Sequence, residues 1–386
     1  MRILFAAVDA YGRLYPVIPL ALAAQRMGHS VTLATHPNLH SEVERAGLAA
    51  VAAGPHMEDL GAEVFEAFAA QDVSPESEAD IYVKAAEIAT GPMMAELEPV
   101  LAEGNYDLVV NESIFAAAAF AAAKAGVPSV QMGVGRIPAG PDWDTIFSAV
   151  VRLAADNGVL IDDPMTLDSP YLDLCPPSLQ LPGFPKPGTT HILMRNTGWN
   201  PPGDLPRTVL DRDPEKPLVY MTLGTTLLYA QPTLFRTMID ALAQLPVQVV
   251  VSTGRAVAAD AFGDIPGNVE VVGWVPATEL LDVTDLAVHH AGSGTTFAAL
   301  ARGVPQLLLP TTSEPLSNAE MVSRAGAGAL ILPGDVTPAR IADEVRRLLD
   351  DSDARAAARK IREEISQLPS AEDAIEQVIQ ATQHQR

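Results

Sequence analysis

The sequence is poor in cysteine and in positive charge. Cys175 is the only cysteine among 386 residues. One thiol closes no internal disulfide and builds no zinc site of clustered cysteines, which fits a reducing compartment. The chain has only 25 lysines and arginines but 48 aspartates and glutamates, which gives a formal net charge of -23. This charge repels nucleic-acid phosphates and anionic lipid headgroups, so neither is expected as a partner.

Long hydrophobic runs are also missing. The apolar run at residues 3–8 ends at Asp9, short of the roughly 7–15 apolar residues of a signal-peptide core. The most apolar later stretch, residues 114–123, ends at Lys124. It is about half as long as the roughly 20 residues that cross a membrane as a helix. We therefore expect a cytoplasmic chain without a membrane span.

Apolar residues make up 48% of the chain, and its length allows two to three domains with at least one large core. Strand-like runs alternate with Ala/Leu-rich helical segments in the first third. We expect strands at residues 2–8, 30–35, 106–110 and 128–132, and helices at 16–27, 41–46 and 114–125. Strands and helices in this order predict a mostly parallel sheet with helices on both faces.

The pattern restarts after a proline-rich stretch at residues 164–217, where one short strand is expected at 191–194. Further strands are expected at 218–223, 248–252, 269–272, 286–290, 306–309 and 328–332. The fold class is thus α/β, with two doubly wound parallel-sheet domains. We expect domains at 1–200 and 217–365, a linker at 201–216 and a helical tail at 366–386 that packs back on the first domain.

No G-x-G-x-x-G motif supports a dinucleotide cofactor. The richest segment follows the strand expected at residues 286–290 and runs from His289 through His290, Ala291, Gly292, Ser293, Gly294 and Thr295 to Thr296. Glycines allow close backbone approach, and a helix start capped by Thr295 or Thr296 offers unpaired N–H groups. This favours an anion site to which His290 adds a hydrogen bond or a positive charge. The alternative is a tight turn with two packed histidines.

Two further side chains follow expected strands. Trp274 comes just after the strand at residues 269–272 and suits stacking on a nucleobase, although a packed core tryptophan is the alternative. Glu314 follows the strand at residues 306–309 and can accept hydrogen bonds from sugar hydroxyls, or can be an ordinary acid at a helix start.

Taken together, several motifs resemble family 1 nucleotide-sugar glycosyltransferases, above all bacterial enzymes that add deoxysugars to natural-product aglycones. They are Gly-Trp-Val-Pro at 273–276, Asp-Leu-Ala-Val-His-His at 285–290, Ala-Gly-Ser-Gly-Thr-Thr at 291–296, Gly-Val-Pro-Gln-Leu-Leu-Leu-Pro at 303–310 and Asn-Ala-Glu at 318–320. Weaker likeness extends through the N-terminal half. The resemblance implies a GT-B fold, in which two Rossmann-like domains face each other across a cleft.

Roles for individual residues follow from this resemblance. Trp274 would stack on the base, with backbone groups of Val275 at the base edge. His290 would contact the diphosphate, Thr225 would lie near the phosphates from another loop, and the turn would bind phosphate oxygens through Gly292, Ser293, Gly294 and Thr295. The resemblance also implies a single inverting displacement at the anomeric carbon, with no metal and no cofactor besides the nucleotide sugar.

The sequence departs from the family pattern in three places. An acid–glutamine pair that grips hexose hydroxyls is replaced by Glu314 and Pro315, which favours a deoxysugar donor. Ala291 replaces a glycine, a small change. Arg13 stands where relatives place the catalytic histidine, and arginine stays protonated.

We expect Arg13 to pair with Glu112 in the loop after the strand at residues 106–110, with Asp9 or Glu112 as the base. Two alternatives are an acceptor that needs no strong base and an Arg13 that points to solvent.

An apolar acceptor wall is predicted in the first domain from Met57, Phe65, Phe68 and Met93, the alternative being core beneath a helix. The preferred function is transfer of a deoxysugar from a dTDP or UDP donor to an aglycone such as a polyketide. A nucleotide-sugar epimerase on the same fold and a non-catalytic nucleotide-sugar-binding protein remain alternatives. Self-association as a homodimer is compatible with the sequence.

Overall fold

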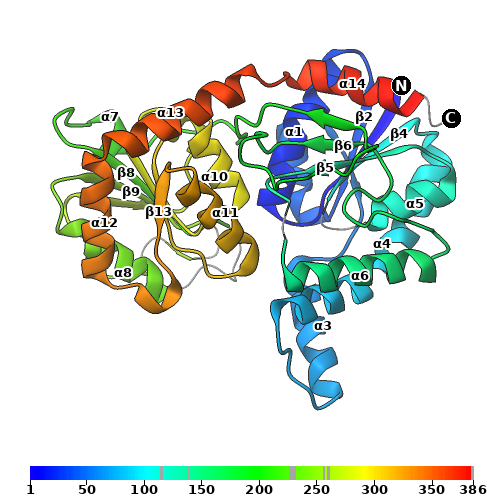
Figure 1. Cartoon of the computed structure of the whole chain (residues 1–386), viewed down its shortest axis with the longest axis horizontal. Helices are drawn as coiled ribbons and strands as arrows, with labels where there is room; N and C mark the ends of the chain where they lie inside the picture. Colours follow the sequence, from blue (N-terminus) through cyan, green and yellow to red (C-terminus); the bar gives the residue numbers. More distant parts are fainter. Residues whose placement is uncertain (114–115, 138, 226–231, 255–256, 259–260, 384–386) are drawn as a thin grey trace. The chain divides into compact units, whose positions relative to one another are not determined.

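The computed structural model describes residues 1–113, 116–137, 139–225, 232–254, 257–258 and 261–383. The chain forms two compact units. The first unit contains Met1–Cys175, Gln180–Arg195 and Leu368–Arg386, and the second contains Pro176–Leu179 and Asn196–Gln367. Helices flank the sheet of each unit (Figure 1).

The first unit is built on a fully parallel sheet in the order β3-β2-β1-β4-β5-β6-β7. Its strands are β1 (Arg2–Ala6), β2 (Ser30–Thr35), β3 (Ala49–Ala52), β4 (Leu108–Glu112), β5 (Ser129–Gly133), β6 (Tyr171–Asp173) and β7 (His191–Leu193). Every residue of β4 is buried, and so is all of β1 after Arg2. Burial of both alternating faces explains why these strands read as continuous apolar runs.

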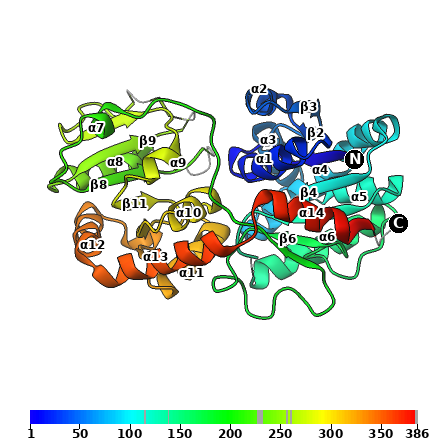
Figure 2. The same ribbon diagram turned by 90° about the horizontal axis from the view of Figure 1, so that it is seen from above.

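Helices cover this sheet on both faces. They are α1 (Tyr11–Arg26), α2 (His40–Arg45), α3 (Met57–Ala70), α4 (Glu78–Gly104), α5 (Ala117–Ala125), α6 (Pro141–Asp156) and α14 (Ala371–Gln383). The long α4 packs against α3, α5 and α6. Although α14 comes last in the sequence, it packs on α1, β5 and β7 in the first unit (Figure 2).

The second unit repeats the design with the parallel order β10-β9-β8-β11-β12-β13. Its strands are β8 (Leu218–Thr222), β9 (Gln248–Ser252), β10 (Val269–Val272), β11 (Leu286–His289), β12 (Gln306–Leu308) and β13 (Gly328–Leu330). Its helices are α7 (Arg207–Leu210), α8 (Pro232–Ala243), α9 (Ala277–Leu281), α10 (Ser293–Leu300), α11 (Ser313–Arg324), α12 (Pro338–Asp350) and α13 (Ser352–Gln367). The expected α/β class with two doubly wound parallel sheets is confirmed.

Several expected boundaries were wrong. The helix expected at residues 16–27 begins at Tyr11, because buried Leu14, Val17 and Ile18 on one face outweigh the helix-breaking tendency of Gly12 and Pro16. Arg13 therefore lies in the first turn of a helix. Glu112 is the last residue of β4 and not part of the following loop. The start of the helix expected at 114–125 lies outside the described residues, and α5 is described from Ala117.

Residues 201–216 do not form a linker between domains. They belong to the second unit, where α7 packs against β9 and β10. Proline excludes this segment from central strands but does not prevent it from packing on a sheet. The N-terminal part of the first unit ends at Arg195, a few residues before the boundary expected at residue 200, and the unit continues with Leu368–Arg386.

Candidate functional site

The candidate donor site lies at the carboxyl edge of the second sheet. Strand order reverses between β8 and β11, which are neighbours although β9 and β10 lie between them in the sequence. Open α/β sheets bind ligands at such a switch point. The loop after β8 carries Gly224 and exposed Thr225, and the loop after β11 carries His290 to Gly292. Thr226 lies outside the described residues.

Two glycines make room for the ring of His290. A Cβ at Gly224 would lie 2.6 Å from Cε1 of His290, and a Cβ at Gly292 would lie 2.3 Å from Nε2. The imidazole therefore lies against the backbone at Gly224 and at Gly292, where neither residue has a side chain. Burial, with a smaller contribution from His289, lowers the pKa of His290 to about 3. The ring is thus neutral at physiological pH and does not supply the positive charge considered from the sequence, whereas its hydrogen bond to a phosphate stays a prediction.

His289 holds the turn together from inside the sheet. Its Nδ1 accepts the Ala291 N–H at 3.1 Å, and its Nε2 lies 2.8 Å from Oε1 of Gln306 on β12. Because Nδ1 is an acceptor, the proton must be on Nε2 and be donated to Gln306. Burial lowers the pKa of His289 to about 4. His289 is therefore a packed histidine, as the alternative of a tight turn with two packed histidines predicts for it.

The first turn of α10 begins differently from the prediction. Its N-cap is Gly292, without a side-chain cap, and the expected caps Thr295 and Thr296 lie within the helix. Gly294 is exposed and Thr295 is half-buried. The first backbone N–H groups of a helix have no partner within the helix, and such groups suit an anion.

A polar chain ties this turn to α11. Buried Asn318 donates through Nδ2 to the Ala291 carbonyl at 3.0 Å and lies 3.1 Å from Oγ of Ser293. Ser293 in turn donates to Oε1 of Glu314 at 3.0 Å. Glu314 thus helps to position the turn while it stays half-buried. Asn318 was part of a family motif, but its place at the site was missed, since the contact joins residues 27 positions apart.

Trp274 lies one residue beyond Gly273, which follows β10. It is 36% exposed, and a Cβ at Gly203 would lie 2.5 Å from its six-membered ring. Gly203 therefore supports the indole from the 201–216 segment while leaving indole surface open. Val275 is buried in the core between the sheet and α9, so only its backbone is available for a ligand.

The first sheet reverses order between β1 and β4, and the residues expected for the acceptor side lie there. Nη1 of Arg13 lies 3.4 Å from Oε1 of Glu112, with 16% and 1% of the two side chains exposed. The expected pair is present, and Arg13 does not point into solvent. A guanidinium beside a buried carboxylate neutralises charge but takes up no proton.

Asp9 has a different partner. Its Oδ2 lies 2.6 Å from Nδ1 of His56 and accepts the Met57 N–H at 3.3 Å. The His36 ring stacks on that of His56, with centroids 5.2 Å apart and planes 10° from parallel. Neither histidine was singled out from the sequence, although each directly follows or closely follows a strand end.

Asp9, His36 and His56 are the one set of potential metal ligands that comes together in the described ranges, within 4.8 Å. Two ligands of a tetrahedral zinc ion lie about 3.3 Å apart, given bonds of roughly 2.0 Å. The 2.6 Å between Asp9 and His56 is instead a hydrogen-bond distance. The geometry is that of a bonded pair with a second ring stacked on it.

The four residues of the predicted acceptor wall differ in burial. Met93 is 2% exposed and belongs to the cluster between the first sheet and its helices, against which Met57 and Phe68 also pack. Phe65 is 56% exposed, and Met57 and Phe68 are half-buried. The prediction of an acceptor wall was therefore wrong for Met93, and the alternative of core beneath a helix is confirmed there. Met93 lies on the buried face of the 27-residue helix α4.

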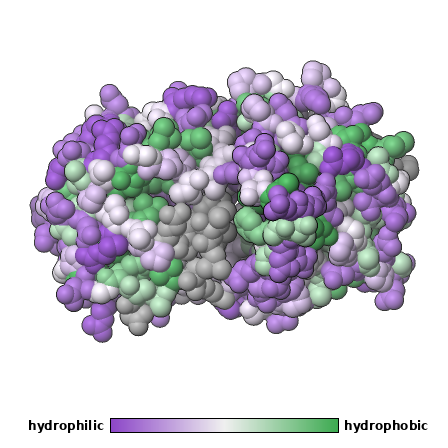
Figure 3. Space-filling view, turned by 90° about the horizontal axis from the view of Figure 1, so that it is seen from below, coloured by the Kyte–Doolittle hydropathy of each residue, from purple (hydrophilic) through white to green (hydrophobic). Residues whose placement is uncertain are grey.

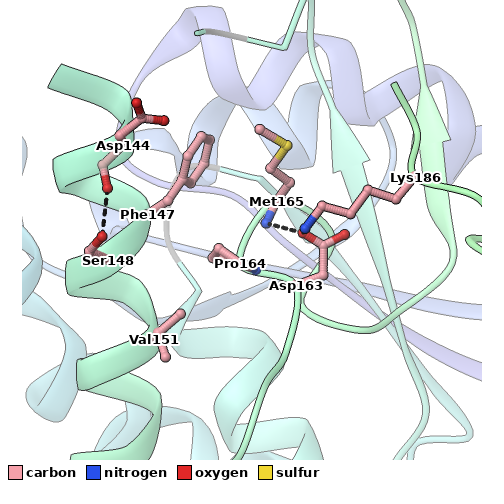
Figure 4. Close-up of a pocket in the computed structure, with 8 residues that line it drawn as sticks. All are labelled: Asp144, Phe147, Ser148, Val151, Asp163, Pro164, Met165 and Lys186. Carbon is pink, nitrogen blue, oxygen red and sulfur yellow. Dashed lines mark hydrogen bonds and ion pairs between the residues drawn. The ribbon is translucent and has the colours of Figure 1, made fainter. Parts of the chain in front are cut away.

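A separate hollow in the first unit has a volume of about 290 Å³. In Figure 4, Phe147 on α6 and Met165 lie on opposite sides of it, and Lys186 pairs with Asp163 at 3.0 Å. None of the predicted acceptor residues lines this hollow. We assign it no role.

Comparisons of the sequence and of the fold with known proteins identify related chains. Residues 22–224 match the N-terminal domain of the erythromycin biosynthesis protein CIII-like family, and residues 236–381 match its C-terminal domain. The L-demethylnoviosyl transferase of Streptomyces niveus is 33% identical, over 96% of this chain and 95% of that protein. The 3-alpha-mycarosylerythronolide B desosaminyl transferase of Saccharopolyspora erythraea is 26% identical, over 97% of each chain.

Among solved structures, the glycosyltransferase VinC in complex with dTDP superposes with a TM-score of 0.78 at 26% identity and covers 100% of both chains. Among the described residues, no helix is both long and apolar enough to cross a membrane. The named relatives and this solved structure are glycosyltransferases, and the enzyme class of this chain is accordingly glycosyltransferase. The chain belongs to the erythromycin CIII-like family and is a glycosyltransferase of natural-product biosynthesis with the GT-B fold.

Proposed function

We propose that this enzyme transfers a deoxysugar from a dTDP or UDP donor to a natural-product aglycone, such as a polyketide, by a single inverting displacement that needs no metal. The observation that carries the donor assignment is the neutral ring of His290, held between Gly224 and Gly292 beside the start of α10. The dTDP complex of VinC and the sugar-transferring relatives support the same donor class.

The second unit would stabilise the leaving diphosphate with neutral donors. The backbone N–H groups and partial positive charge at the start of α10 suit phosphate oxygens, and His290 adds a side-chain hydrogen bond. Negative charge that develops on the leaving group is then met by preorganised dipoles instead of a cation. The indole of Trp274, backed by Gly203, would stack on the base.

The sugar side of the site favours a donor with few hydroxyls. Pro315 is buried and has no side-chain amide, and the half-buried Glu314 already accepts a hydrogen bond from Ser293. This arrangement leaves fewer polar groups for a fully hydroxylated hexose. A deoxysugar presents less unpaired polar surface to such a pocket.

Calorimetry with dTDP in the presence of a chelator tests the donor site. We expect binding without metal, and a loss of about 1.5–3 kcal/mol, or roughly 10- to 150-fold in Kd, for His290→Ala, as for a hydrogen bond to a charged group. His29→Gln, at the opposite edge of the first sheet, is the matched histidine control. A need for magnesium, or an His290→Ala variant with normal affinity and a normal melt, would contradict the proposal.

Transfer itself is tested by product release. Incubation with dTDP-deoxysugars and a panel of aglycones should release dTDP only when an acceptor is present. Release that does not depend on acceptor would indicate hydrolysis and would argue against the proposed transfer.

A further inference from the structure

The loss of the family histidine at position 13 raises the question of which group accepts the acceptor proton. Arg13 stays charged, and the Glu112 side chain is 1% exposed beside it. Oδ2 of Asp9 already accepts two hydrogen bonds. None of the three residues expected from the sequence is well placed to be the base.

The segments that follow three neighbouring strands place Asp9 and two histidines, His36 and His56, at the same sheet edge. Asp9 follows β1, His36 follows β2 and His56 follows β3, where it is the N-cap of α3. This is the carboxyl edge of the first sheet, at which open α/β folds bind ligands. Asp9 and Arg13 lie on the same short segment, so the three residues belong to the edge that carries Arg13 and Glu112.

We propose that His56 is the catalytic base of this enzyme and that Asp9 is the residue that positions it. The inference rests on the proposed function and deepens it, because it assigns the proton acceptor of the same transfer reaction. The hydrogen bond of 2.6 Å between Nδ1 of His56 and Oδ2 of Asp9 carries the argument. With Nδ1–H donated to the carboxylate, the lone pair of Nε2 faces away from Asp9.

The surroundings hold the ring in this orientation. The amide Nδ2 of Asn38 lies 3.1 Å from Nδ1 and 3.2 Å from Nε2 of His56, so it contacts the ring without selecting between the two nitrogens. The His36 ring braces the His56 ring by stacking, and Nδ1 of His36 accepts the Asn38 N–H at 3.3 Å. The His56 side chain is 27% exposed, so an acceptor hydroxyl can reach it.

The charges that face His56 strengthen it as a base. The hydrogen bond to Asp9 raises the pKa of His56, burial opposes this to a smaller extent, and the charges of Asp9, Asp59 and Glu58 each raise the pKa by less. The Glu58 carboxylate lies 3.9 Å from Nε2. A base is most effective when its pKa lies close to the working pH.

The acceptor hydroxyl gives its proton to Nε2 of His56, and the oxygen electron pair forms the new bond to the anomeric carbon. The bond between that carbon and the diphosphate oxygen breaks, and its electron pair leaves with the nucleotide diphosphate. Asp9 keeps its charge and stabilises the imidazolium that forms.

The test compares His56→Gln, Asp9→Asn and the control His29→Gln in the acceptor-dependent release assay. We expect kcat of His56→Gln to fall by about 10²- to 10⁴-fold, with dTDP affinity and the melt unchanged and with partial rescue by added imidazole. Asp9→Asn should move the acidic limb of the pH–rate profile to lower pH. His29→Gln should match wild type. A chelator should change none of these rates.

Histidine NMR titration provides a readout that does not depend on turnover. The His56 midpoint should lie higher in wild type than in Asp9→Asn. An equal midpoint, or a His56→Gln variant that keeps its rate and pH profile, would overturn the proposal. If wild type shows no acceptor-dependent release at all, the proposed function fails, while the titration still decides whether Asp9 controls His56.

Discussion

At the scale of single residues, glycines decide what the aromatic rings of the donor site can present to a ligand. Gly203 supports the Trp274 indole, whereas Gly224 and Gly292 leave space for the His290 ring. At each of these positions a Cβ would come within about 2.6 Å of ring atoms, closer than van der Waals contact allows. These glycines are therefore required by close approach of the rings, whatever backbone conformation they adopt.

Trp274 provides the residue-scale prediction. Trp274→Ala should weaken dTDP binding by about 1–3 kcal/mol, the usual value of base–aromatic stacking, whereas Trp274→Phe should keep a large part of the affinity. Calorimetry measures both variants, and a thermal melt controls for folding. Unchanged affinity in a folded Trp274→Ala protein would make the indole a packing residue only.

At the scale of elements, the donor turn depends on α11 as much as on β11. Asn318 on α11 reaches both the Ala291 carbonyl and Ser293, and Glu314 at the start of the same helix accepts from Ser293. His289 anchors the turn from below through Gln306 on β12. Contacts from α11 and β12 thus hold the turn that joins β11 to α10.

Asn318→Ala should loosen this turn. The variant leaves the buried Ala291 carbonyl without its amide donor, which costs about 1–3 kcal/mol of stability, and it should weaken dTDP binding as well. Glu320→Gln on the same helix removes only an exposed ion pair with Arg324 and should stay near wild type. Denaturant melts and calorimetry compare them. Equal behaviour of the two variants would rule out the tie between α11 and the turn.

At the scale of the whole molecule, the acidic surface and the buried histidines both bear on stability at low pH. Hydrophilic residues surround separate hydrophobic patches on the face shown in Figure 3, as expected for a net charge of -23. His289 and His290 are neutral inside the second unit because burial lowers their pKa values to about 4 and about 3. Both take up protons near pH 6.5 when the chain unfolds.

The second unit should therefore lose stability on acidification. As pH falls from about 6.5 toward 4, the unfolded state binds protons that the folded state does not, so the unfolding free energy decreases by up to about 1.4 kcal/mol per pH unit for each histidine. In His289→Gln the slope should be shallower. A Trp143→Phe background makes tryptophan fluorescence report only Trp199 and Trp274, both in the second unit. Equal slopes between pH 5 and 6.5 would contradict the prediction.

The α/β fold class of this protein could be predicted from the local sequence pattern alone. Continuous apolar runs alternating with Ala/Leu-rich helices led to two parallel sheets, because strands buried on both faces need apolar side chains at every position. The segment from His289 to Thr296 indicated an anion site, because a glycine turn before a helix has a local cause. Trp274 and Glu314 were singled out as candidates because residues that follow parallel strands gather at one sheet edge.

Only the tertiary structure decided which side chains meet there. The Asp9–His56 bond joins residues 47 positions apart, and Asn318 reaches across 27 positions to Ala291. Such pairings depend on strand order and register, which periodicity does not encode. The same holds for the ionisation of His290: its low pKa comes from complete burial between loops of different strands, and burial is a property of the folded chain and not of any segment read by itself.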